Sequence, residues 1–359
     1  MSNEILFTPF NLGPLTLKNR VVMSPMTRNR SLGNVPGDIV ATYYEQRAAA
    51  GLIVTEGTAP SANGCGYARI PGLWTADQLA GWKKVTAGVH AKGGKIFVQL
   101  MHTGRASHPD NLPKGAKIVA PSAIALAESV FVDPDGPKPV PVPNALTEAE
   151  IEATIEEYAA SGALAIEAGF DGVEIHGANG YLVDQFLNTA SNTRTDKWGG
   201  SVENRIRFAV EVSRRLAARI GKERVGIRVS PYGAFNKMVS DAAIEDVYEQ
   251  LAKELSAIGL VYIHVVDHSS MGAPEVKPSV KRKIRDGFKG AYILSGGYDA
   301  ARAAADLTEK KGDLVAFGRP FLANPDLVTK LKDGKPLTAP DFATFYTPGP
   351  KGYIDYPTA

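Results

Sequence analysis

Cysteine is nearly absent from this chain of 359 residues, in which Cys65 is the single example. One thiol cannot form a disulfide within the chain, and it excludes an iron–sulfur cluster, which needs several thiolates. Long hydrophobic runs are missing too, since none approaches the ~20 residues that a membrane-spanning helix requires. The first residues, MSNEILFTPFNLGPL, lack the basic flank and the apolar core of a signal peptide. These absences predict a cytoplasmic protein that does not act at a membrane.

An excess of one charge sign is also missing. The chain has 40 basic and 38 acidic residues, and the net charge of +2 argues against nucleic acid or a membrane surface as a partner. Four basic residues do lie close together, and we expect them to form a solvated helix face: Lys281, Arg282, Lys283 and Arg285.

Eight short apolar runs, rich in Val, Ile and Leu, recur along the chain. They are Arg20–Ser24, Leu52–Glu56, Lys95–Leu100, Gly172–His176, Val225–Ser230, Val261–Val265, Ala291–Ser295 and Asp313–Phe317. Near-continuous apolar strands are typical of a parallel sheet that is buried on both faces.

Helical patterns separate these strands. Thr75 with Gln78, and Thr147 with Glu150, have the spacing of a capping box, and Ser201 is a favourable N-cap. The predicted helices are Asp38–Ala50, Asp77–Ala91, Glu148–Ala168, Val202–Arg219, Ala242–Ala257, Pro278–Arg285, Ala300–Glu309 and Pro325–Lys332.

The alternation predicts an α/β fold, either a (β/α)8 TIM barrel or an open doubly wound sheet. We favour the barrel, as a single domain over residues 1–359, because eight units match its strand count. A barrel uses ~250 residues, so the excess lies in insertions. Leu6–Leu17 is expected to form an N-terminal hairpin that closes the barrel floor. Thr103–Ala145 is a long loop insertion after strand 3, either a lid or a surface excursion. The tail Phe345–Pro357 carries three tyrosines.

The end of the fourth strand carries the most informative cluster of polar residues. His176, Asn179 and Tyr181 follow one another within six positions, at the rim where barrel enzymes place their active sites. They supply two hydrogen-bond donors and a phenolic acid, which suits polarising a substrate and then protonating it. The bland alternative is that His176 and Asn179 only satisfy buried backbone groups. No second histidine or carboxylate lies nearby at zinc spacing, so we predict no metal.

Two glycine-containing loops follow the seventh and eighth strands. Gly296, Gly297 and Gly318 would let backbone N–H groups approach an anion, and Arg319 can direct two donors to phosphate oxygens. Barrels often bind phosphate between these two loops. The ligand could be a sugar phosphate or the phosphate tail of a flavin. No strand–GxGxxG–helix unit is present, so a Rossmann site for a nicotinamide is not expected.

Two carboxylates raise another alternative, since Glu56 and Glu174 could be the acid pair of a glycosidase. However, Glu174 lies within a strand and two residues before His176, which puts it on the same face but deeper in the barrel. We therefore interpret Glu174 as a buried structural carboxylate.

Several motifs occur together in a fixed order: Pro25-Met26-Thr27-Arg28, Gln99, His176-Gly-Ala-Asn179-Gly-Tyr181-Leu, Asn192-Thr-Arg-Thr-Asp-Lys-Trp-Gly-Gly-Ser-Val-Glu-Asn-Arg205 and Gly318-Arg-Pro-Phe321. Over essentially the whole chain they resemble the old yellow enzyme family of FMN-dependent ene reductases. Thr27 and the HxxN pattern resemble the branch typified by the yeast and enterobacterial enzymes.

This resemblance implies a role for each matching residue. Thr27 would bond the flavin O4, Gln99 and Arg228 would bind the pyrimidine edge, and Ala59 would contact the ring through its backbone. The whole implied FMN site is Pro25, Met26, Thr27, Ala59, Gln99, Arg228, Gly296, Gly297, Gly318 and Arg319. His176 and Asn179 would anchor the substrate oxygen, and Tyr181 would protonate Cα after hydride reaches Cβ from flavin N5. Tyr67, Met101 and Tyr353 would line the substrate pocket, with Met101 standing where many relatives carry tryptophan.

The predicted activity is therefore reduction of activated C=C bonds by NADPH or NADH through FMN, with α,β-unsaturated carbonyls, maleimides or nitroalkenes as substrates. Both the nicotinamide and the alkene would use the open site above the flavin, in a monomer or a homodimer. A flavin-free sugar-phosphate lyase or isomerase is the alternative, and it would need a catalytic Lys or Glu at the rim. A flavin-binding redox sensor with little turnover is a third.

Overall fold

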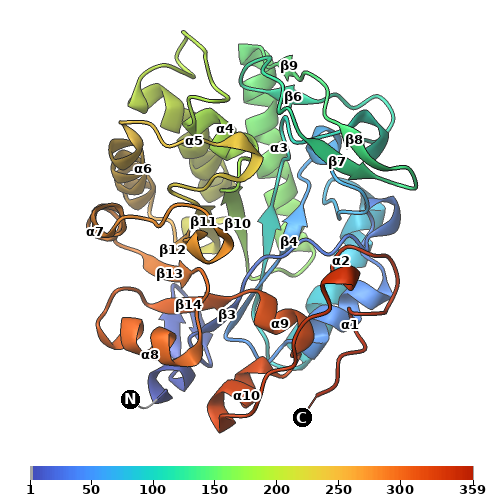
Figure 1. Ribbon diagram of the computed structural model, residues 1–359, viewed down its shortest axis with the longest axis vertical. Helices are drawn as coiled ribbons and strands as arrows, with labels where there is room; N and C mark the ends of the chain where they lie inside the picture. Colours follow the sequence, from blue (N-terminus) through green and yellow to red (C-terminus); the bar gives the residue numbers. More distant parts are fainter. Residues whose placement is uncertain (1–2, 359) are drawn as a thin grey trace.

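The computed structural model describes residues 3–358, and a closed barrel of eight parallel strands lies at its centre (Figure 1). The strands, in barrel order, are β3 (Val21–Met23), β4 (Leu52–Thr58), β5 (Ile96–Leu100), β10 (Gly172–Gly177), β11 (Val225–Val229), β12 (Tyr262–Val266), β13 (Ala291–Ser295) and β14 (Leu314–Phe317). All eight predicted strands are confirmed, and the closed order excludes the open doubly wound sheet.

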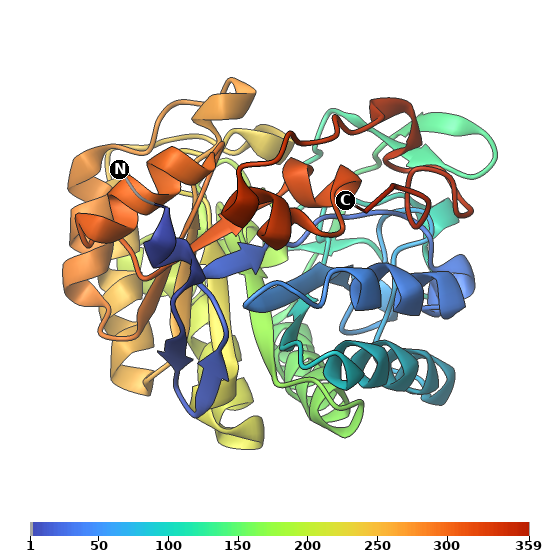
Figure 2. The same ribbon diagram turned by 90° about the horizontal axis from the view of Figure 1, so that it is seen from below.

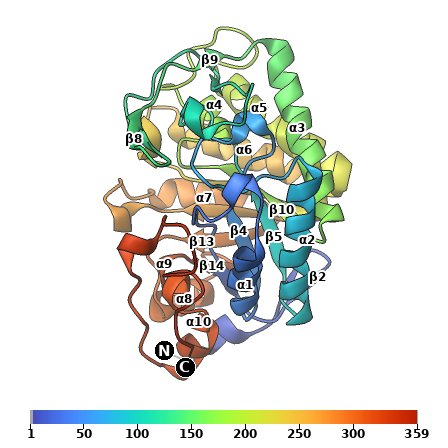
Figure 3. The same ribbon diagram turned by 90° about the vertical axis from the view of Figure 1, so that its right-hand side faces the viewer.

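The strands are mostly apolar and almost entirely buried because helices cover their outer faces and side chains fill the barrel interior. Figure 3 shows α2 and α3 outside β5 and β10. The helices are α1 (Asp38–Gln46), α2 (Ala76–Ala91), α3 (Glu148–Glu167), α4 (Leu182–Leu187), α5 (Val202–Ile220), α6 (Ile244–Ile258), α7 (Pro278–Gly287), α8 (Ala300–Thr308), α9 (Arg319–Ala323) and α10 (Leu327–Asp333). Short 3-10 helices occur at Glu4–Phe7, Leu32–Asn34, Ala62–Gly64, Pro109–Asn111, Lys222–Arg224, Phe235–Lys237, Ser269–Met271 and Phe342–Thr344.

Local side-chain bonds define where the long helices begin. Both predicted capping boxes form, one between Thr75 and Gln78 before α2 and one between Thr147 and Glu150 before α3. Ser201 accepts the N–H of Asn204 at the start of α5, also as predicted. The helices α4 and α9 were not predicted, because five or six residues are too few to show a helical period.

The barrel floor is closed by the N-terminal hairpin of β1 (Phe10–Leu12) and β2 (Leu15–Leu17), dark blue in Figure 2. Gly13 takes a φ of +56° in the turn, which glycine adopts without strain. Leu12 and Leu17 are buried against inward-facing residues of the strands, among them Val54 and Phe97. The hairpin predicted at Leu6–Leu17 forms over Phe10–Leu17, after a 3-10 helix at Glu4–Phe7.

The insertion between β5 and α3 is more ordered than a loop. It contains β7 (Ser129–Val132) paired antiparallel with β8 (Gly136–Pro139), and β6 (Val119–Ala120) paired with β9 (Asn144–Ala145). Strands of two to four residues carry too little alternation to be recognised in a proline-rich sequence.

The basic cluster on α7 is a partly exposed, ion-paired surface, as expected. Lys281 pairs with Asp267 at 2.8 Å, and Arg285 with Asp313 at 2.7 Å. Among the described residues, no helix is both long and apolar enough to cross a membrane.

Candidate active site

A cavity of about 1220 Å³ opens at the carboxyl ends of the barrel strands. This volume exceeds the roughly 300–1,000 Å³ of an ordinary ligand pocket, so a cofactor and a substrate can fit together. Thirteen of the predicted site residues line it: Pro25, Met26, Thr27, Tyr67, Gln99, His176, Asn179, Tyr181, Arg228, Gly296, Gly297, Gly318 and Arg319. The barrel therefore brings most of the predicted site into one space.

His176, on β10, can present an N–H group to this cavity. Its side chain is 3% exposed, and burial, followed by the charge of Arg228, holds its pKa well below the usual value. The imidazole is therefore neutral at physiological pH. The N–H of Ala178 points at Nδ1 at 3.3 Å, so Nδ1 accepts and the single ring proton is on Nε2. That proton makes Nε2 a hydrogen-bond donor.

Asn179 presents a second donor, and His268 sets its orientation. The Nε2 atom of His268 lies 2.6 Å from Oδ1 of Asn179. Burial lowers the pKa of His268 to about 4, so this ring is neutral too, and it donates from Nε2 to the amide oxygen. The NH₂ group of Asn179 then remains to donate elsewhere. The sequence offered no pattern that connects His268, 89 residues away, to this role.

Tyr181 lies at the start of α4 and closes this group of residues. Its ring packs edge-on against the His176 ring at 4.9 Å between centroids, and its hydroxyl hydrogen-bonds with that of Tyr67. Burial raises the pKa of Tyr181 well above the usual 10, so the phenol keeps its proton across the neutral range. The hydroxyl can therefore serve as a general acid, but at neutral pH it is not ionised and cannot serve as a general base.

A buried cation without a full set of partners lies on the neighbouring strand β11, in register with His176. Arg228, at the end of β11, is 6% exposed, and its Nε has no hydrogen-bond partner among the described residues. Buried charges are normally paired, so this guanidinium is suited to an anionic or electron-rich ligand. Gln99, on β5, is held in place by its Nε2, which donates to Glu174 at 2.7 Å.

Neither of the two candidate carboxylates lines the cavity. Glu174 is fully buried and bonds Tyr262 at 3.0 Å and His264 at 2.9 Å, which is the structural role predicted for it. Glu56 accepts the backbone N–H of Arg28, and burial raises its pKa to about 7. The paired-carboxylate geometry of a glycosidase is therefore absent from the described site.

The loops after β13 and β14 are adjacent, as a shared phosphate site requires. Gly296 and Gly297 have φ values of +130° and +63°. A Cβ on Gly296 would lie 2.1 Å from the carbonyl oxygen of Asp267, so only glycine fits there. A Cβ on Gly318 would make only ordinary contacts, at 3.6 Å from the Met26 sulfur and 3.9 Å from Cβ of Ser24, and Arg319 follows as an exposed cation at the cavity edge.

Three predicted contacts are contradicted by the structure. Ala59 is fully buried and does not line the cavity, with its N–H donated to Pro71 and its carbonyl oxygen accepting from Leu73. Met101 is 1% exposed, and its sulfur packs against Gly57 instead of lining the cavity. Tyr353 is fully buried and stacks on the ring of Tyr43 at 4.1 Å.

Two other segments form the outer wall in their place. The first is the β7–β8 hairpin and the residue before it, where Glu128 pairs with Lys237 at 3.2 Å across the mouth. The second is the C-terminal tail, through Phe342, Phe345 and Tyr346. The insertion thus borders the cavity, and of the three tail tyrosines noted in the sequence Tyr346 is the one that lines it.

Comparisons with known proteins agree with this geometry. The sequence model of the NADH:flavin oxidoreductase / NADH oxidase family matches residues 5–338. Chanoclavine-I aldehyde reductase fgaOx3 of Penicillium roqueforti is 44% identical over 98% of this chain and 95% of its own length. A probable flavin mononucleotide-dependent alkene reductase of Leishmania infantum is 40% identical over 99% of this chain and 98% of its own. The solved structure of morphinone reductase superimposes with a TM-score of 0.95, at 45% identity over 100% of this chain and 97% of that one. Morphinone reductase has also been solved in complex with tetrahydroNAD.

Proposed function

The chain belongs to the NADH:flavin oxidoreductase / NADH oxidase family, the old yellow enzyme family, and we propose that it is an NAD(P)H-dependent FMN ene reductase. The observation that carries the proposal is the pair of N–H donors, on His176 and Asn179, that share one cavity with a protonated Tyr181. Such a set is suited to an alkene that is conjugated to a carbonyl or nitro group.

The cavity fits FMN in both charge and shape. Arg228, with its unpartnered Nε, and Gln99 would hold the pyrimidine edge, and Thr27 would bond the ring system. The phosphate would be held between Gly296 and Gly297 after β13, where a side chain is excluded, and Gly318 after β14, with Arg319 as the cation. When bound, FMN would carry hydride from NADPH or NADH to the alkene.

His176 and Asn179 would bind the oxygen of the activating group. Adding hydride at Cβ of an enone moves negative charge onto that oxygen, so donors already in place stabilise the transition state more than the substrate. Neither ring of the His176 and His268 pair needs to change protonation, because both are neutral in the working range. The two donors therefore orient the alkene and polarise it.

Tyr181 would then protonate Cα. Its hydroxyl keeps its proton until the substrate becomes basic, and Tyr67 is positioned to hydrogen-bond the phenolate that remains. The site needs no metal and no carboxylate for these steps.

The outer wall favours apolar substrates. Phe131, Phe235, Phe342 and Tyr346 all line the cavity and are between 39% and 63% exposed. Enones, maleimides and nitroalkenes with a hydrophobic body would bury these rings. The alternative, a sugar-phosphate lyase or isomerase, is disfavoured because no lysine of residues 3–358 lines the cavity and its one lining glutamate, Glu128, is ion-paired with Lys237.

The proposal is tested with purified protein under anaerobic conditions. We expect a yellow protein with one FMN per chain that bleaches when NADPH or NADH is added and regains its colour with 2-cyclohexenone. A colourless protein that does not take up FMN would refute the proposal. A flavoprotein that bleaches but is not reoxidised by any alkene would instead support the redox-sensor alternative.

A further inference from the structure

The turn that carries Asn179 has an unfavourable backbone conformation. Asn179 and Gly180, just before Tyr181, have φ values of +61° and +71°, two left-handed residues in succession. This region is disfavoured for any residue with a Cβ, as Asn179 has. Something outside the turn must therefore hold it.

Side chains bind all four backbone polar groups of this turn. The Asn179 N–H donates to Ser230 Oγ at 2.9 Å, and the Asn179 carbonyl accepts from Asn236 at 2.7 Å. The Gly180 N–H donates to Asp184 Oδ2 at 2.8 Å, and the Gly180 carbonyl accepts from Gln185 at 2.8 Å. The turn is thus fixed by its surroundings and not by regular secondary structure.

Asp184 is the carboxylate among these partners, and it reaches both N–H groups. It accepts from Gly180 directly. Ser230 Oγ accepts from Asn179, which leaves its own proton for the Asp184 carboxylate, with which it hydrogen-bonds. One side chain on α4 therefore holds two residues of the turn, the second through Ser230.

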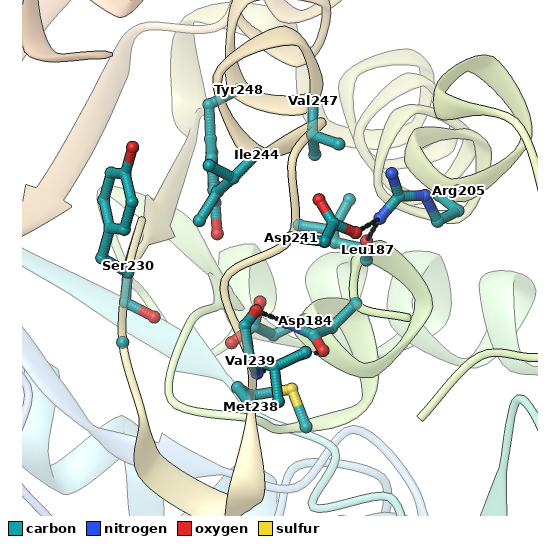
Figure 4. Close-up of a pocket in the computed structure, with 13 residues that line it drawn as sticks. Asp184, Leu187, Arg205, Ser230, Met238, Val239, Asp241, Ile244, Val247 and Tyr248 are labelled. Carbon is teal, nitrogen blue, oxygen red and sulfur yellow. Dashed lines mark hydrogen bonds and ion pairs between the residues drawn. The ribbon is translucent and has the colours of Figure 1, made fainter. Parts of the chain in front are cut away.

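Asp184 does not contact the cavity in which ligands would bind, so ligand binding does not explain its presence. It is 3% exposed and does not line the large cavity. It borders a separate space of about 20 Å³, shown in Figure 4, that is too small for more than roughly one water molecule. Burying a carboxylate in this way lowers the free energy of unfolding, so we expect Asp184 to have a functional role that offsets this cost.

We propose that Asp184 is a positioning residue of the ene reductase site, and that with Ser230 it holds the Asn179–Gly180 turn so that the Asn179 amide and the Tyr181 hydroxyl face the substrate. The inference rests on the proposed function, which gives Asn179 and Tyr181 their roles. Asp184 itself touches neither substrate nor cofactor and acts through the turn.

The charged form of Asp184 is the one that can hold the turn. An ionised carboxylate accepts from Gly180 and Ser230 together, while protonation turns one oxygen into a donor. Burial raises its pKa to about 7, although the bonds from Gly180 and Ser230 oppose this. Protonation in the neutral range should therefore loosen the turn.

The charged and titratable groups that border the space beside Asp184 are one ion pair and two tyrosines. Arg205 on α5 is ion-paired with Asp241 at 2.9 Å, as the dashed line in Figure 4 shows. Tyr248 on α6 has a pKa raised well above 10 by burial and then by Asp184 itself, so it stays neutral. Tyr232, after β11, completes the wall.

Stability and activity should then respond in opposite directions to Asp184→Asn. The folded pKa of about 7 exceeds the unfolded value of ~3.9, so ionisation of Asp184 costs stability progressively as the pH rises from about 4 to about 7. Asparagine avoids this cost. We expect the holoenzyme variant to melt at a higher temperature than the wild type at pH 8, with the margin shrinking toward pH 5.

The activity test follows anaerobic reoxidation of the reduced holoenzyme by 2-cyclohexenone between pH 5.5 and 8.5. For the wild type, kcat/KM should fall as the pH drops through 7. Asp184→Asn should be about ten-fold slower at pH 8 and nearly flat below it, like the protonated wild type. Ser230→Ala should act in the same direction and not additively with Asp184→Asn. Glu56→Gln is the matched control, since Glu56 also has a pKa of about 7 but does not bond the turn. This variant should keep the wild-type fall of kcat/KM below pH 7.

Hydrogen exchange provides a readout that does not depend on turnover. The Gly180 amide should exchange faster in Asp184→Asn at pH 8 than in the wild type, whether or not the protein reduces alkenes. The positioning role would be overturned by unchanged exchange of the Gly180 amide in Asp184→Asn, or by a kcat/KM of this variant that still falls as the pH drops through 7. A wild type that no alkene reoxidises would refute the proposed function alone, because the exchange and melting results would still decide the role of Asp184.

Discussion

The protonation states of single side chains explain how a site without a metal can polarise a substrate. His176 and His268 are both buried and neutral, and each has one nitrogen already committed, His176 Nδ1 to Ala178 and His268 Nε2 to Asn179. What remains on the substrate side is one N–H of His176 and the NH₂ group of Asn179. The hydrogen bonds on the protein side, from Ala178 and His268, therefore determine which donors of His176 and Asn179 remain for the substrate.

Replacing Tyr181 with phenylalanine tests the proton donor. The ring contacts with His176 are kept and only the hydroxyl is lost, so we expect reoxidation of the reduced flavin by alkenes to slow by about 10²-fold or more. Reduction by NADPH should change little, because that step takes no proton from the phenol. Stopped-flow measurement of the two half-reactions separates them, with Tyr67→Phe as the neighbouring hydroxyl deletion. Equal slowing of both half-reactions would argue against Tyr181 as the acid.

At the level of loops and helices, the C-terminal tail is the segment whose anchoring matters most. Arg30, 3% exposed, donates to the tail carbonyl oxygens of Thr344, Phe345, Gly349 and Lys351 at 2.8 to 3.0 Å. The same tail lines the cavity through Phe345 and Tyr346. One buried arginine thus connects the β3–α1 loop to the outer wall of the site.

Arg30→Met should loosen the C-terminal tail without altering His176, Asn179 or Tyr181. Each buried carbonyl that loses its donor costs about 1–3 kcal/mol, so we expect the tail to open locally and the KM for 2-cyclohexenone to rise several-fold. Limited proteolysis should cut the variant within residues 342–352. Arg214→Met, on the exposed face of α5, is the matched control and should change neither property. Wild-type KM and protease resistance in Arg30→Met would show that the tail is held by other contacts.

For the barrel as a whole, the cofactor should be part of the fold's stability. The cavity of about 1220 Å³ reaches into the barrel mouth, and Arg228 at its inner wall has an unpartnered Nε. A ligand that fills this space and pairs this cation binds the native state alone and stabilises it by about 2.7 kcal/mol at 100 times its Kd. The fold and the site are therefore thermodynamically linked.

Comparing FMN with riboflavin tests the phosphate loops. We expect the deflavinated protein to unfold in one cooperative transition, as a single barrel should, and FMN to raise its melting temperature more than riboflavin does. Arg319→Ala should reduce the stabilisation by FMN and leave that by riboflavin unchanged, since Arg319 is proposed to contact only the phosphate. Calorimetry of the four combinations measures this. Equal stabilisation by both ligands would place the phosphate outside the loops after β13 and β14.

The sequence by itself was sufficient to predict the barrel strands and the longer helices of this protein. Strand and helix periods, two capping boxes and the glycine pairs are local patterns, because each depends on residues within a few positions of one another. Barrel closure follows from eight such units, and closure alone brings thirteen of the predicted residues to one rim.

Only the tertiary structure decided which contacts lie between distant segments. Ala59, Met101 and Tyr353 were misplaced because their neighbours, respectively Pro71, Gly57 in β4 and Tyr43 in α1, belong to other segments that only the fold brings against them. The same holds for His268 behind Asn179 and for Asp184 behind the turn. Their roles depend on distance, burial and protonation state, which are properties of the folded environment and have no signature in the order of residues.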